Sequence, residues 1–481
     1  MFVSNRPIAL PRVPVGRAAL VAPLPEPSTS DPVRKLAFVL GLALLFLRAS
    51  MLHQIQAQLM GFNLRLLYVV GLPALFGVVL AGSIKLTLQR RMAWYWVGFA
   101  GWMALTVPWS MWKMGSLLLL VGYVRSDLIM LFIIGGLVLT WRECKLMMFA
   151  LAGAAVVNLL SSRLLLKEEG FGGRLGLGFG SIENPNDFAC HLLLMLPFLL
   201  WVAHYTKSIV LRISALAGVG FGIYTILRTG SRGALVALVL AALFALVRGT
   251  APQRIILLAS AAVLIPVLLF TLPKETLRRV TSFSASAASA SQEALGSSAM
   301  REYLLRKSLD YALHNPIFGV GAGQFAWAEG MQNRVGGTTH GYWHETHNTY
   351  LQVASECGFP ALLLFISGIV SAFLLLNSTW RQARQRPDCK DIAAASFYVM
   401  IATVAFCTAI FFLSFAYFFY LPAVAGLAIA LDRTARAEFR SRAARVLEPP
   451  QLPWDGPSHG FRTGVGWTPA GLARAKQHTA S

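Results

Sequence analysis

Long apolar segments alternate with short polar ones along most of this chain. Runs of about 18 or more residues with almost no charge are long enough to cross the hydrocarbon core of a bilayer as helices. The pattern therefore predicts an all-α polytopic membrane protein with about twelve transmembrane helices. The predicted spans lie near residues 34–50, 64–82, 92–109, 126–141, 144–162, 186–205, 208–227, 231–247, 254–272, 359–377, 393–412 and 414–431.

Polar segments divide these spans into three blocks. The stretch 113–124 is apolar but short, so we expect it to lie along the membrane interface. No small-residue cleavage site follows the first apolar run, so the N-terminal tail is not expected to be a signal peptide. The predicted parts are a disordered tail at 1–32, spans at 33–162, a loop at 163–185, spans at 186–272, a large loop at 273–358, spans at 359–431 and a disordered basic tail at 432–481.

Composition supports a membrane protein. The chain is 56% hydrophobic and 13% charged, with a mean hydropathy of +0.60, whereas a soluble domain carries about twice that charged fraction. The five cysteines are widely spaced, which favours neither a disulfide framework nor a CxxC metal site.

The net charge of +21 is explained by topology. In a soluble protein it would suggest a nucleic-acid partner, but cytoplasmic loops of membrane proteins are themselves rich in Lys and Arg. With the N-terminus inside, basic and weakly charged loops alternate, which predicts two cytoplasmic termini and outward-facing loops at 163–185 and 273–358. No nucleic-acid partner is expected. The basic residues of the predicted inner loops are Lys85, Arg90, Arg91, Arg142, Lys145, Lys207, Arg212, Arg248, Arg254, Arg381, Arg384, Arg386 and Lys390.

The large outer loop begins with a low-complexity stretch and continues with a helix. Residues 281–298 are rich in Ser and Ala, and we expect a flexible flap there. The next segment, MREYLLRKSLDYALHN (300–315), has helical spacing and predicts an amphipathic helix lying on the outer surface. One face of it carries Tyr303, Leu304, Ser308 and Tyr311.

The segment HETHNTYLQVASECGFP places an imidazole at the start of a helix. Residues from Asn348 onward have the spacing of a short helix, and Gly358 followed by Pro360 predicts a stop and a new start into the next span. His347 would stand just before the short helix, where imidazole can serve as a general base near neutral pH. The alternative is an interfacial histidine that only caps or packs.

A metal site at the same histidines is the weaker hypothesis. His340, His344 and His347 are spaced four and three residues apart, as ligands on one helical face can be. The motif is not HExxH, however, because Asn348 occupies the position of the second histidine. Gly341 also disfavours a helix through this segment. We therefore predict no metal site.

Several arginines lie on or near the predicted outer face, against the positive-inside bias. Guanidinium groups bind phosphate well. The alternative is that arginines at helix ends reach towards lipid headgroups. These residues are Arg174, Arg228, Arg232, Arg301 and Arg306.

Two loop motifs have structural explanations. ENPNDFAC (183–190) predicts a turn in which Asn186 or Asp187 caps the next span and Pro185 prevents an earlier start. NPIFGVGAGQF (315–325) contains GxGxG, but no strand precedes it, so it predicts a tight turn and not a nucleotide site.

Four motifs occur in a fixed order between residues 174 and 376. They are RLGLGFGSIENPNDFA (174–189), TGSRGALVAL (229–238), the Arg of MREYLLRKSLDYALHNPIFGVGAGQF (300–325) and HETHNTYLQVASECGFPALLLF (344–365). The ordered set resembles the O-antigen ligase/O-antigen polymerase superfamily of bacterial inner-membrane glycosyltransferases. The N-terminal spans match this superfamily only in number and hydrophobicity.

The resemblance implies a GT-C-like, all-helical fold with a large periplasmic loop, no metal or other cofactor, and a donor glycan on undecaprenyl pyrophosphate. His347 falls on the family's histidine, the expected base for the acceptor hydroxyl. Arg174 and Arg301 would hold the donor pyrophosphate, and Arg232 falls near the lipid-phosphate cavity. The residues expected to support these are Asn348, Glu345 and Asp187.

One position departs from the family pattern. The helix of the large loop usually carries a Trp a few residues after its Arg, where this chain has Leu304, Leu305 and Arg306. The departure affects the expected packing of the loop and leaves the charged residues in place.

The expected activity is the transfer or polymerisation of lipid-linked glycan at the periplasmic face of the inner membrane, with inversion at the anomeric carbon. The acceptor would be lipid A-core in a ligase or another lipid-linked glycan in a polymerase, and transfer to protein Ser or Thr is a third option. A transporter, or a non-catalytic partner in polysaccharide export, is the alternative from another class. A transporter should carry polar groups at mid-depth in several spans, whereas the ionisable groups here gather in 163–185 and 273–347.

Overall fold

The structure is a computed structural model that describes residues 28–165, 167–169, 174–177, 179–182, 184–281, 292–335 and 343–447. The chain divides into one compact unit up to Phe439 and a second unit from Arg440 onward. The predictions made for 1–27, for His340 and for 448–481 lie outside the described residues.

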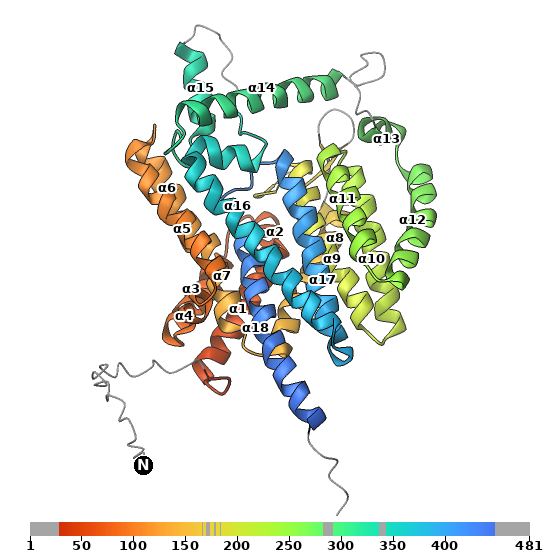
Figure 1. Cartoon of the computed structure of the whole chain (residues 1–481). Coiled ribbons are helices and arrows are strands. Elements are labelled where there is room, and N and C mark those ends of the chain that lie inside the picture. The colour runs from red at the N-terminus through yellow and green to blue at the C-terminus, as the bar shows by residue number, and fades with distance from the viewer. Residues whose placement is uncertain are drawn as a thin grey trace, which may run out of the picture. The chain divides into compact units, whose positions relative to one another are not determined.

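Helices account for nearly all of the described chain (Figure 1). The first half contains α1 (Pro32–Ala49), α2 (Leu52–Met60), α3 (Leu66–Leu80), α4 (Ser83–Leu88), α5 (Arg91–Thr106), η1 (Val107–Trp109), α6 (Lys113–Gly122), the π-helix η2 (Tyr123–Leu128), α7 (Ile129–Leu137), α8 (Trp141–Leu165) and α9 (Pro185–Tyr205). The second half contains α10 (Ile209–Arg228), α11 (Arg232–Arg248), α12 (Ala251–Thr271), α13 (Lys274–Thr281), α14 (Gln292–His314), α15 (Phe325–Val335), α16 (Thr349–Arg384), η3 (Pro387–Cys389), α17 (Lys390–Ala409), η4 (Ile410–Phe412) and α18 (Tyr420–Leu447).

The all-α polytopic fold predicted from the apolar runs is confirmed, and the protein is a multi-pass membrane protein. Seven helices among the described residues are long and apolar enough to cross a membrane, or eight if α1 and α2, bent by 64°, form one span. The other predicted spans correspond to helices that are shorter or more charged, namely α3, α5, α11 and α18.

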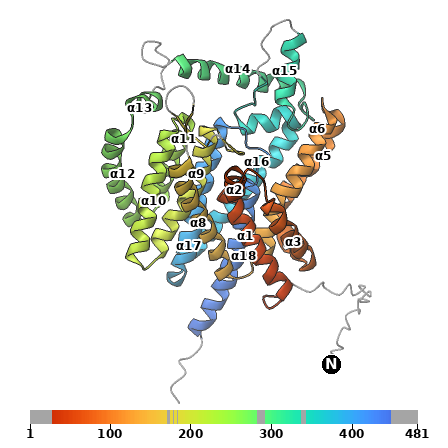
Figure 2. The ribbon, with the colours of Figure 1, turned by 180° about the vertical axis from the view of Figure 1, so that it is seen from behind.

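The bundle of the first unit is layered around two helices. α9 and α17 are largely buried and pack against each other. Figures 1 and 2 show α10, α11 and α12 on one side of this pair and α5 and α6 on the other. The helices α13, α14 and α15 lie together at one end of the bundle, called the loop end below (Figure 1).

The prediction that 113–124 lies along the interface is wrong. Residues Lys113–Leu137 form one apolar span that continues through the π-helix η2. Asp127 lies near the middle of this span and pairs with Arg48 of α1 across 2.7 Å. A neutralising partner from a distant helix allows a carboxylate to remain within an apolar segment.

The prediction of disorder from residue 432 is also wrong for 432–447, because α18 continues to Leu447. Its continuation is stabilised by Asp432, which is only 2% exposed. This carboxylate pairs with Arg90 at 2.5 Å and with Arg436 at 3.0 Å. Burial of a charge with both partners in place favours an ordered helix over a solvated tail.

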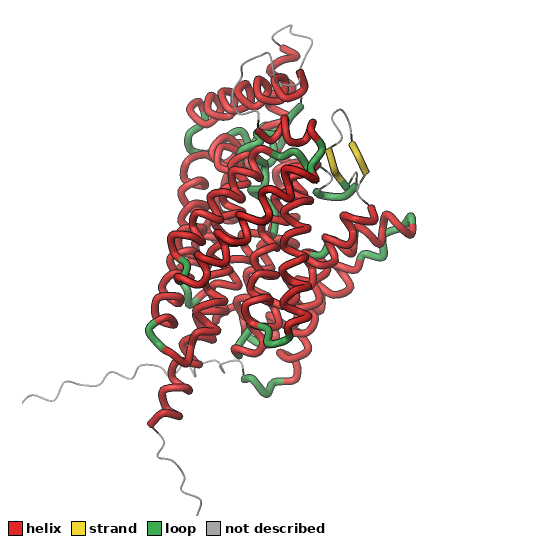
Figure 3. Tube along the Cα trace, turned by 90° about the vertical axis from the view of Figure 1, so that its right-hand side faces the viewer, coloured by secondary structure: helices red, strands yellow, loops and turns green. Residues whose placement is uncertain are grey.

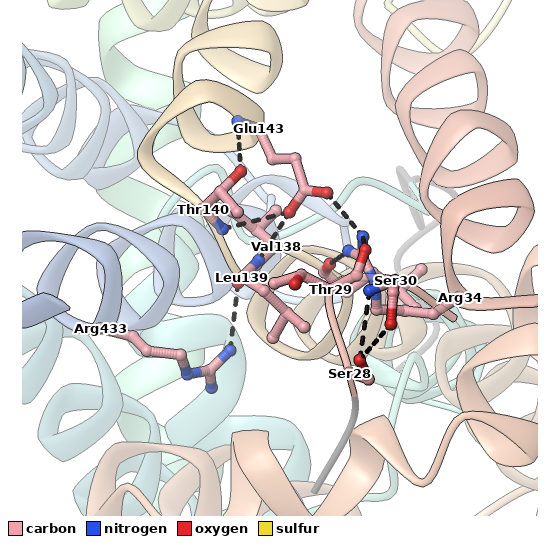
Figure 4. Close-up of polar contacts among 10 residues, drawn as sticks. Ser28, Thr29, Ser30, Arg34, Val138, Leu139, Thr140, Glu143 and Arg433 are labelled. Atoms are coloured by element: carbon pink, nitrogen blue, oxygen red, sulfur yellow. Dashed lines mark hydrogen bonds and ion pairs between the residues drawn. The ribbon is translucent and has the colours of Figure 1, made fainter. Parts of the chain in front are cut away.

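A second carboxylate fastens the end of the bundle opposite the loop end (Figure 4). Glu143 of α8 accepts hydrogen bonds from the backbone N–H groups of Leu139 and Thr140, at 2.8 and 3.2 Å. It also pairs with the buried Arg34 of α1 at 2.8 Å. Arg433 of α18 donates to a carbonyl of the same turn at 3.3 Å. The turn between α7 and α8 therefore joins α1 to α18.

The loop end contains a helix of its own and a short hairpin. Figures 1 and 3 show α14 running across this end and the two strands beside it. The predicted face of α14 is confirmed, because Leu304 and Ser308 are fully buried and Tyr311 nearly so. The predicted flap at 281–298 is wrong from Gln292 onward, where α14 has already begun. Good helix formers such as Gln, Glu, Ala and Leu open this segment.

The strands β1 (Lys167–Glu169) and β2 (Arg174–Gly176) form an antiparallel pair within the predicted loop 163–185. The register places Glu169 opposite Arg174. The hairpin was not predicted, because it is shorter than the runs that alternation can reveal. It fixes the chain direction at Arg174.

α16 bends where it leaves the loop end. Gly358 interrupts it with a φ of +81°, as the predicted stop and new start require. The turn 315–323 packs into the bend, and the Phe359 N–H donates to the carbonyl of Pro316 at 2.8 Å. A Cβ on Gly358 would lie 2.1 Å from the carbonyl oxygen of Ile317, so only glycine fits.

A buried carboxylate joins three elements beside this bend. Glu356 of α16 is 3% exposed. It accepts hydrogen bonds from the N–H groups of Gly323 and Phe325, at 2.9 and 3.2 Å, where α15 begins. It also accepts one from the Tyr417 hydroxyl at 2.6 Å. α15, α16 and the linker before α18 are thereby held together.

We predict that Gly358→Ala destabilises the protein, because the side chain would clash with backbone and the φ/ψ region is one that almost only glycine adopts. The expected loss is about 3 kcal/mol or more, measured as a lower midpoint of thermal unfolding in detergent. Gly101→Ala is the control, since a Cβ there meets nothing within 4 Å in the helix α5. Equal midpoints for the two variants would contradict the prediction.

Candidate functional site

Two helix N-termini meet at the loop end. The hydroxyl of Ser231 accepts from the Ala234 N–H at 3.4 Å and caps α11. Asn184 caps α9 by accepting from the Asn186 N–H at 2.9 Å. The first turns of both helices line one small pocket, and Arg301 of α14 lines it as well. Free N–H groups and the helix dipoles at such termini favour an anion.

The cap of α9 differs from the one predicted. Asn186 or Asp187 was expected to cap the helix, with Pro185 preventing an earlier start, but α9 begins at Pro185 and Asn184 is the cap. Proline fits the first position of a helix, since the N–H that it lacks would have no helical partner there. Asn186 and Asp187 are thereby moved into the first turn.

Arg174 joins α9 to the turn before α11. Its Nε donates to the carbonyl of Thr229 at 2.9 Å, and one of its terminal nitrogens donates to Asn186 Oδ1 at 2.9 Å. The side chain is therefore fixed beside the two helix N-termini. The sequence motif had placed Arg174 and Asn186 in one loop, and the structure shows them in direct contact.

Three further guanidinium groups converge from α11, α13 and α14. Partial burial lowers the pKa of Arg301, and the cations of Arg232 and Arg279 lower it further. Gly230 lets the side chains approach one another, since a Cβ on it would lie 3.4 Å from the Nε of Arg279 and 3.6 Å from that of Arg174. The resulting arginine cluster, defined as Arg174, Arg232, Arg279 and Arg301, surrounds one turn of backbone.

The sequence did not predict Arg279 as a site residue. It did suggest Arg228 and Arg306, which are not members of the arginine cluster. Arg279 follows a predicted span in the basic segment KETLRRV, a signal that was overlooked. Arg306 is 77% exposed and pairs with Glu302 on the surface of α14. Arg228, at the end of α10, donates to the Tyr224 hydroxyl at 3.2 Å.

The backbone at His347 is held from both sides by the linker between α17 and α18. Its φ is +48°, in the left-handed region that residues other than glycine rarely adopt. The His347 N–H donates to Ser414 Oγ at 3.0 Å. Thr349 Oγ1 donates to the carbonyl of Leu413 at 2.7 Å and accepts from the Phe415 N–H at 2.9 Å. Leu413 also lines the pocket between the helix N-termini, so His347 stands beside that pocket.

The environment of His347 keeps its imidazole neutral. Partial burial lowers its pKa to about 4, with further lowering by the positive charge of Arg301 and by His344. Because this pKa lies below the usual value of about 6.5, the imidazole is unprotonated across the neutral pH range. The positive charge of Arg301 that lowers the pKa of His347 is also the charge that would attract an anion.

The predicted supporting residues lie around this histidine in different ways. Asn348 caps α16 by accepting from the N–H groups of Tyr350 and Leu351, both at 3.0 Å, which confirms the predicted helix start. Glu345 is exposed and lies near Ser414. Asp187 is half-buried in the first turn of α9. Ser414 was not foreseen, because nothing in its sequence surroundings marks it.

Of the three histidines considered for a metal, the structure describes His344 and His347. His340 lies outside the described residues. Among the residues that are described, no group of three or more His, Cys, Asp or Glu side chains gathers as ligands would.

The described residues thus combine a multi-pass helical bundle with a small pocket, several arginines and a neutral histidine at one end of it. In a comparison with family models, residues 215–366 match the model described as O-antigen ligase. The match supports the O-antigen ligase superfamily, a glycosyltransferase-like family of ligases and polymerases, and confirms the resemblance seen in the motifs. The matched region contains Arg232, Arg279, Arg301 and His347, whereas Arg174 precedes it. A search of curated proteins found no match.

We predict that His347 titrates near pH 4 in the folded protein and that Arg301→Gln raises its pKa towards 6.5, because a nearby cation disfavours the imidazolium. Diethyl pyrocarbonate modifies neutral imidazole, so the rate of modification at His347, followed by peptide mass spectrometry against pH, reports the pKa. A synthetic peptide covering 343–351 serves as the reference. A midpoint that is the same in peptide and protein would show that burial and Arg301 have no effect.

Proposed function

We propose that this protein transfers or polymerises a glycan carried on undecaprenyl pyrophosphate, and that the reaction takes place at the loop end. The observation that carries the proposal is the convergence of the arginine cluster on two helix N-termini beside a neutral histidine. The match to the O-antigen ligase model supports the same class of reaction.

The arginine cluster suits a diphosphate. Guanidinium forks pair with phosphate oxygens in two-point contacts. Helix N-termini add partial positive charge at the same place. Arg174, fixed to Asn186 and Thr229, and Arg301, lining the pocket, would hold the diphosphate of the donor, and Arg232 would lie at its lipid-linked end. Four fixed cations can stabilise the charge that develops on a leaving diphosphate without a metal ion.

His347 would act as the general base. As an acceptor hydroxyl attacks the anomeric carbon, its proton passes to the neutral imidazole. The new carbon–oxygen bond forms while the bond to the diphosphate breaks, and the electron pair of that bond leaves with undecaprenyl pyrophosphate. Attack from the side opposite the leaving group inverts the anomeric centre.

The orientation follows from charge. The basic turns after α4, α7, α9, α11 and α16 lie at the end of the bundle opposite the loop end (Figures 1 and 2). By the positive-inside rule we expect that end to face the cytoplasm of a bacterial inner membrane, and both termini of the chain to be cytoplasmic. The loop end then faces the periplasm. The acceptor would be lipid A-core or another lipid-linked glycan.

A buried polar group within the bundle favours a second candidate, transport. His191 of α9 is fully buried: its Nδ1 hydrogen-bonds to the Tyr420 hydroxyl at 2.9 Å, and its Nε2 lies within 3.0 Å of both the Asn158 side-chain nitrogen and the carbonyl of Ala49, with one of which it hydrogen-bonds. Polar groups inside a membrane often mark a substrate path. These partners satisfy one another where α1 gives way to α2, however, which is also what a structural joint requires. Retention of glycan transfer by His191→Ala, measured as below, would support the joint.

We predict that His347→Ala abolishes glycan transfer while the protein stays folded and inserted, because the substitution removes the proposed base. Silver-stained gels of surface glycans from a host that expresses only the variant provide the measurement. His314→Ala, on the exposed side of α14, is the matched control and should give normal ladders. Normal ladders from His347→Ala would reject the proposed base and favour a non-catalytic role.

We predict that Arg301→Ala reduces the kcat/KM of transfer by roughly a hundredfold or more, the usual loss when a preorganised donor to a leaving group is removed. Arg301→Lys should recover only part of it, since it keeps the charge but not the fork. Arg306→Ala, one turn further along α14 in a surface ion pair, should change the rate little. Equal effects of the two alanine variants on transfer from host lipid-linked glycan would contradict the assignment.

Deletion of the gene separates the proposed acceptors. A ligase mutant should lose its lipopolysaccharide ladder and accumulate lipid-linked polymer. A polymerase mutant should retain single repeats. A mutant whose lipopolysaccharide ladder and lipid-linked glycans are both unchanged would contradict the proposed function.

A further inference from the structure

Trp343 is held in an unusual conformation close to the proposed base. Its φ is +51°, which is rare for a bulky residue, and its side chain is 42% exposed. Left-handed backbone at a non-glycine residue persists where surrounding contacts fix it, and such positions cluster at ligand sites. Within five residues, both Trp343 and His347 adopt it.

Neighbouring residues fix the position of the Trp343 ring and leave part of it exposed. The Trp343 N–H donates to Glu329 Oε2 at 2.9 Å, and the other oxygen of this buried carboxylate accepts from the Tyr303 hydroxyl at 3.2 Å. The indole lies against Gly330 of α15, where a Cβ would be 2.4 Å from the ring. The ring of Trp327 meets it edge to face, with centroids 5.2 Å apart.

The alternative explanation is the belt of aromatic residues that membrane proteins place at the interface. Trp109 fits it: the side chain is 59% exposed and stacks on Phe318 at 4.2 Å. Trp343 differs because its position depends on a glycine, a buried carboxylate and a strained backbone. It is also only four residues from His347, which limits their separation to about 14 Å.

We propose that the exposed face of Trp343 is a carbohydrate-binding subsite for the acceptor glycan, an inference that rests on the proposed function. The apolar C–H face of a pyranose ring packs on an exposed indole, and the hydroxyl groups around that face need polar partners. His344 and Glu345 are exposed and follow Trp343 directly in the chain.

The position of Trp343 favours the acceptor over the donor. It packs on α15, whereas Arg279 belongs to α13, and these helices lie beyond opposite ends of α14 (Figures 1 and 2). In a displacement with inversion, acceptor and leaving diphosphate approach the anomeric carbon from opposite sides. A subsite on the α15 side of His347 therefore meets the acceptor.

Kinetics with the full-length protein in nanodiscs test the subsite. The donor is lipid-linked glycan extracted from the host, and the acceptor probe is the host's surface glycan released by mild acid. Trp343→Ala should raise the KM for this probe about tenfold and leave the KM for the donor nearly unchanged. Trp343→Phe should retain most of the affinity. Trp109→Ala, exposed to a similar degree, should leave both values unchanged.

Gly330→Ala provides a second variant that keeps every aromatic residue. The added methyl group must displace the Trp343 ring, while alanine itself is favoured within a helix, so the KM for the probe should rise as in Trp343→Ala. Gly101→Ala is its control. Unchanged KM for the probe in both Trp343→Ala and Gly330→Ala would overturn the subsite.

Two further measurements separate the ways in which the proposal can be wrong. A smaller quenching of tryptophan fluorescence by brominated lipids in Trp343→Ala than in the unaltered protein, together with an unchanged KM, would identify a membrane anchor. Saturation-transfer NMR between the glycan probe and the His347→Ala protein measures binding without turnover and should be lost in the double variant with Trp343→Ala. If His347→Ala itself leaves surface glycans normal, the proposed function fails, whatever the binding result.

Discussion

The carboxylate of Glu356 is the interaction on which the arrangement of the loop end depends. It accepts hydrogen bonds from the start of α15 and from the linker before α18. Glu356 itself belongs to α16 and lies beside the bend at Gly358. His347 lies in the segment that leads into α16, and the residues that contact Trp343 belong to α15. A buried acceptor left with fewer partners costs roughly 1–3 kcal/mol, so these elements are expected to loosen together and not one at a time.

Charge is treated differently at the two ends of the bundle. Opposite the loop end, cations and carboxylates pair closely, as Arg34 with Glu143 and Arg90 with Asp432. At the loop end, cations approach other cations, and burial together with the charges of Arg232 and Arg279 lowers the pKa of Arg301. Close pairs stabilise helix contacts. On the proposed function, a bound diphosphate would meet several guanidinium groups at once, which suits a cluster of this kind to binding an anion.

Sequence patterns predicted the helices well, because an apolar run long enough to span a bilayer has few other stable structures. They failed where the outcome depends on a distant partner. Asp127 interrupts an apolar run until Arg48 neutralises it, and Asp432 marks the end of a run until Arg90 and Arg436 pair with it. Motifs located His347 and three arginines. The convergence of Arg279 with them, and the strained backbone of Trp343, arise only when separate helices meet.

The proposed mechanism explains why a base with so low a pKa can serve at neutral pH. A general base works best when its pKa is near the pH at which it acts. Burial, followed by the charge of Arg301, holds the pKa of His347 well below neutral pH. On the proposed function, a bound diphosphate places negative charge beside Arg301 and offsets its effect on the imidazole. The pKa of His347 then rises towards the working range after the donor has bound. Donor binding would therefore prepare the base, and an acceptor arriving at an empty pocket would meet an imidazole that holds a proton poorly.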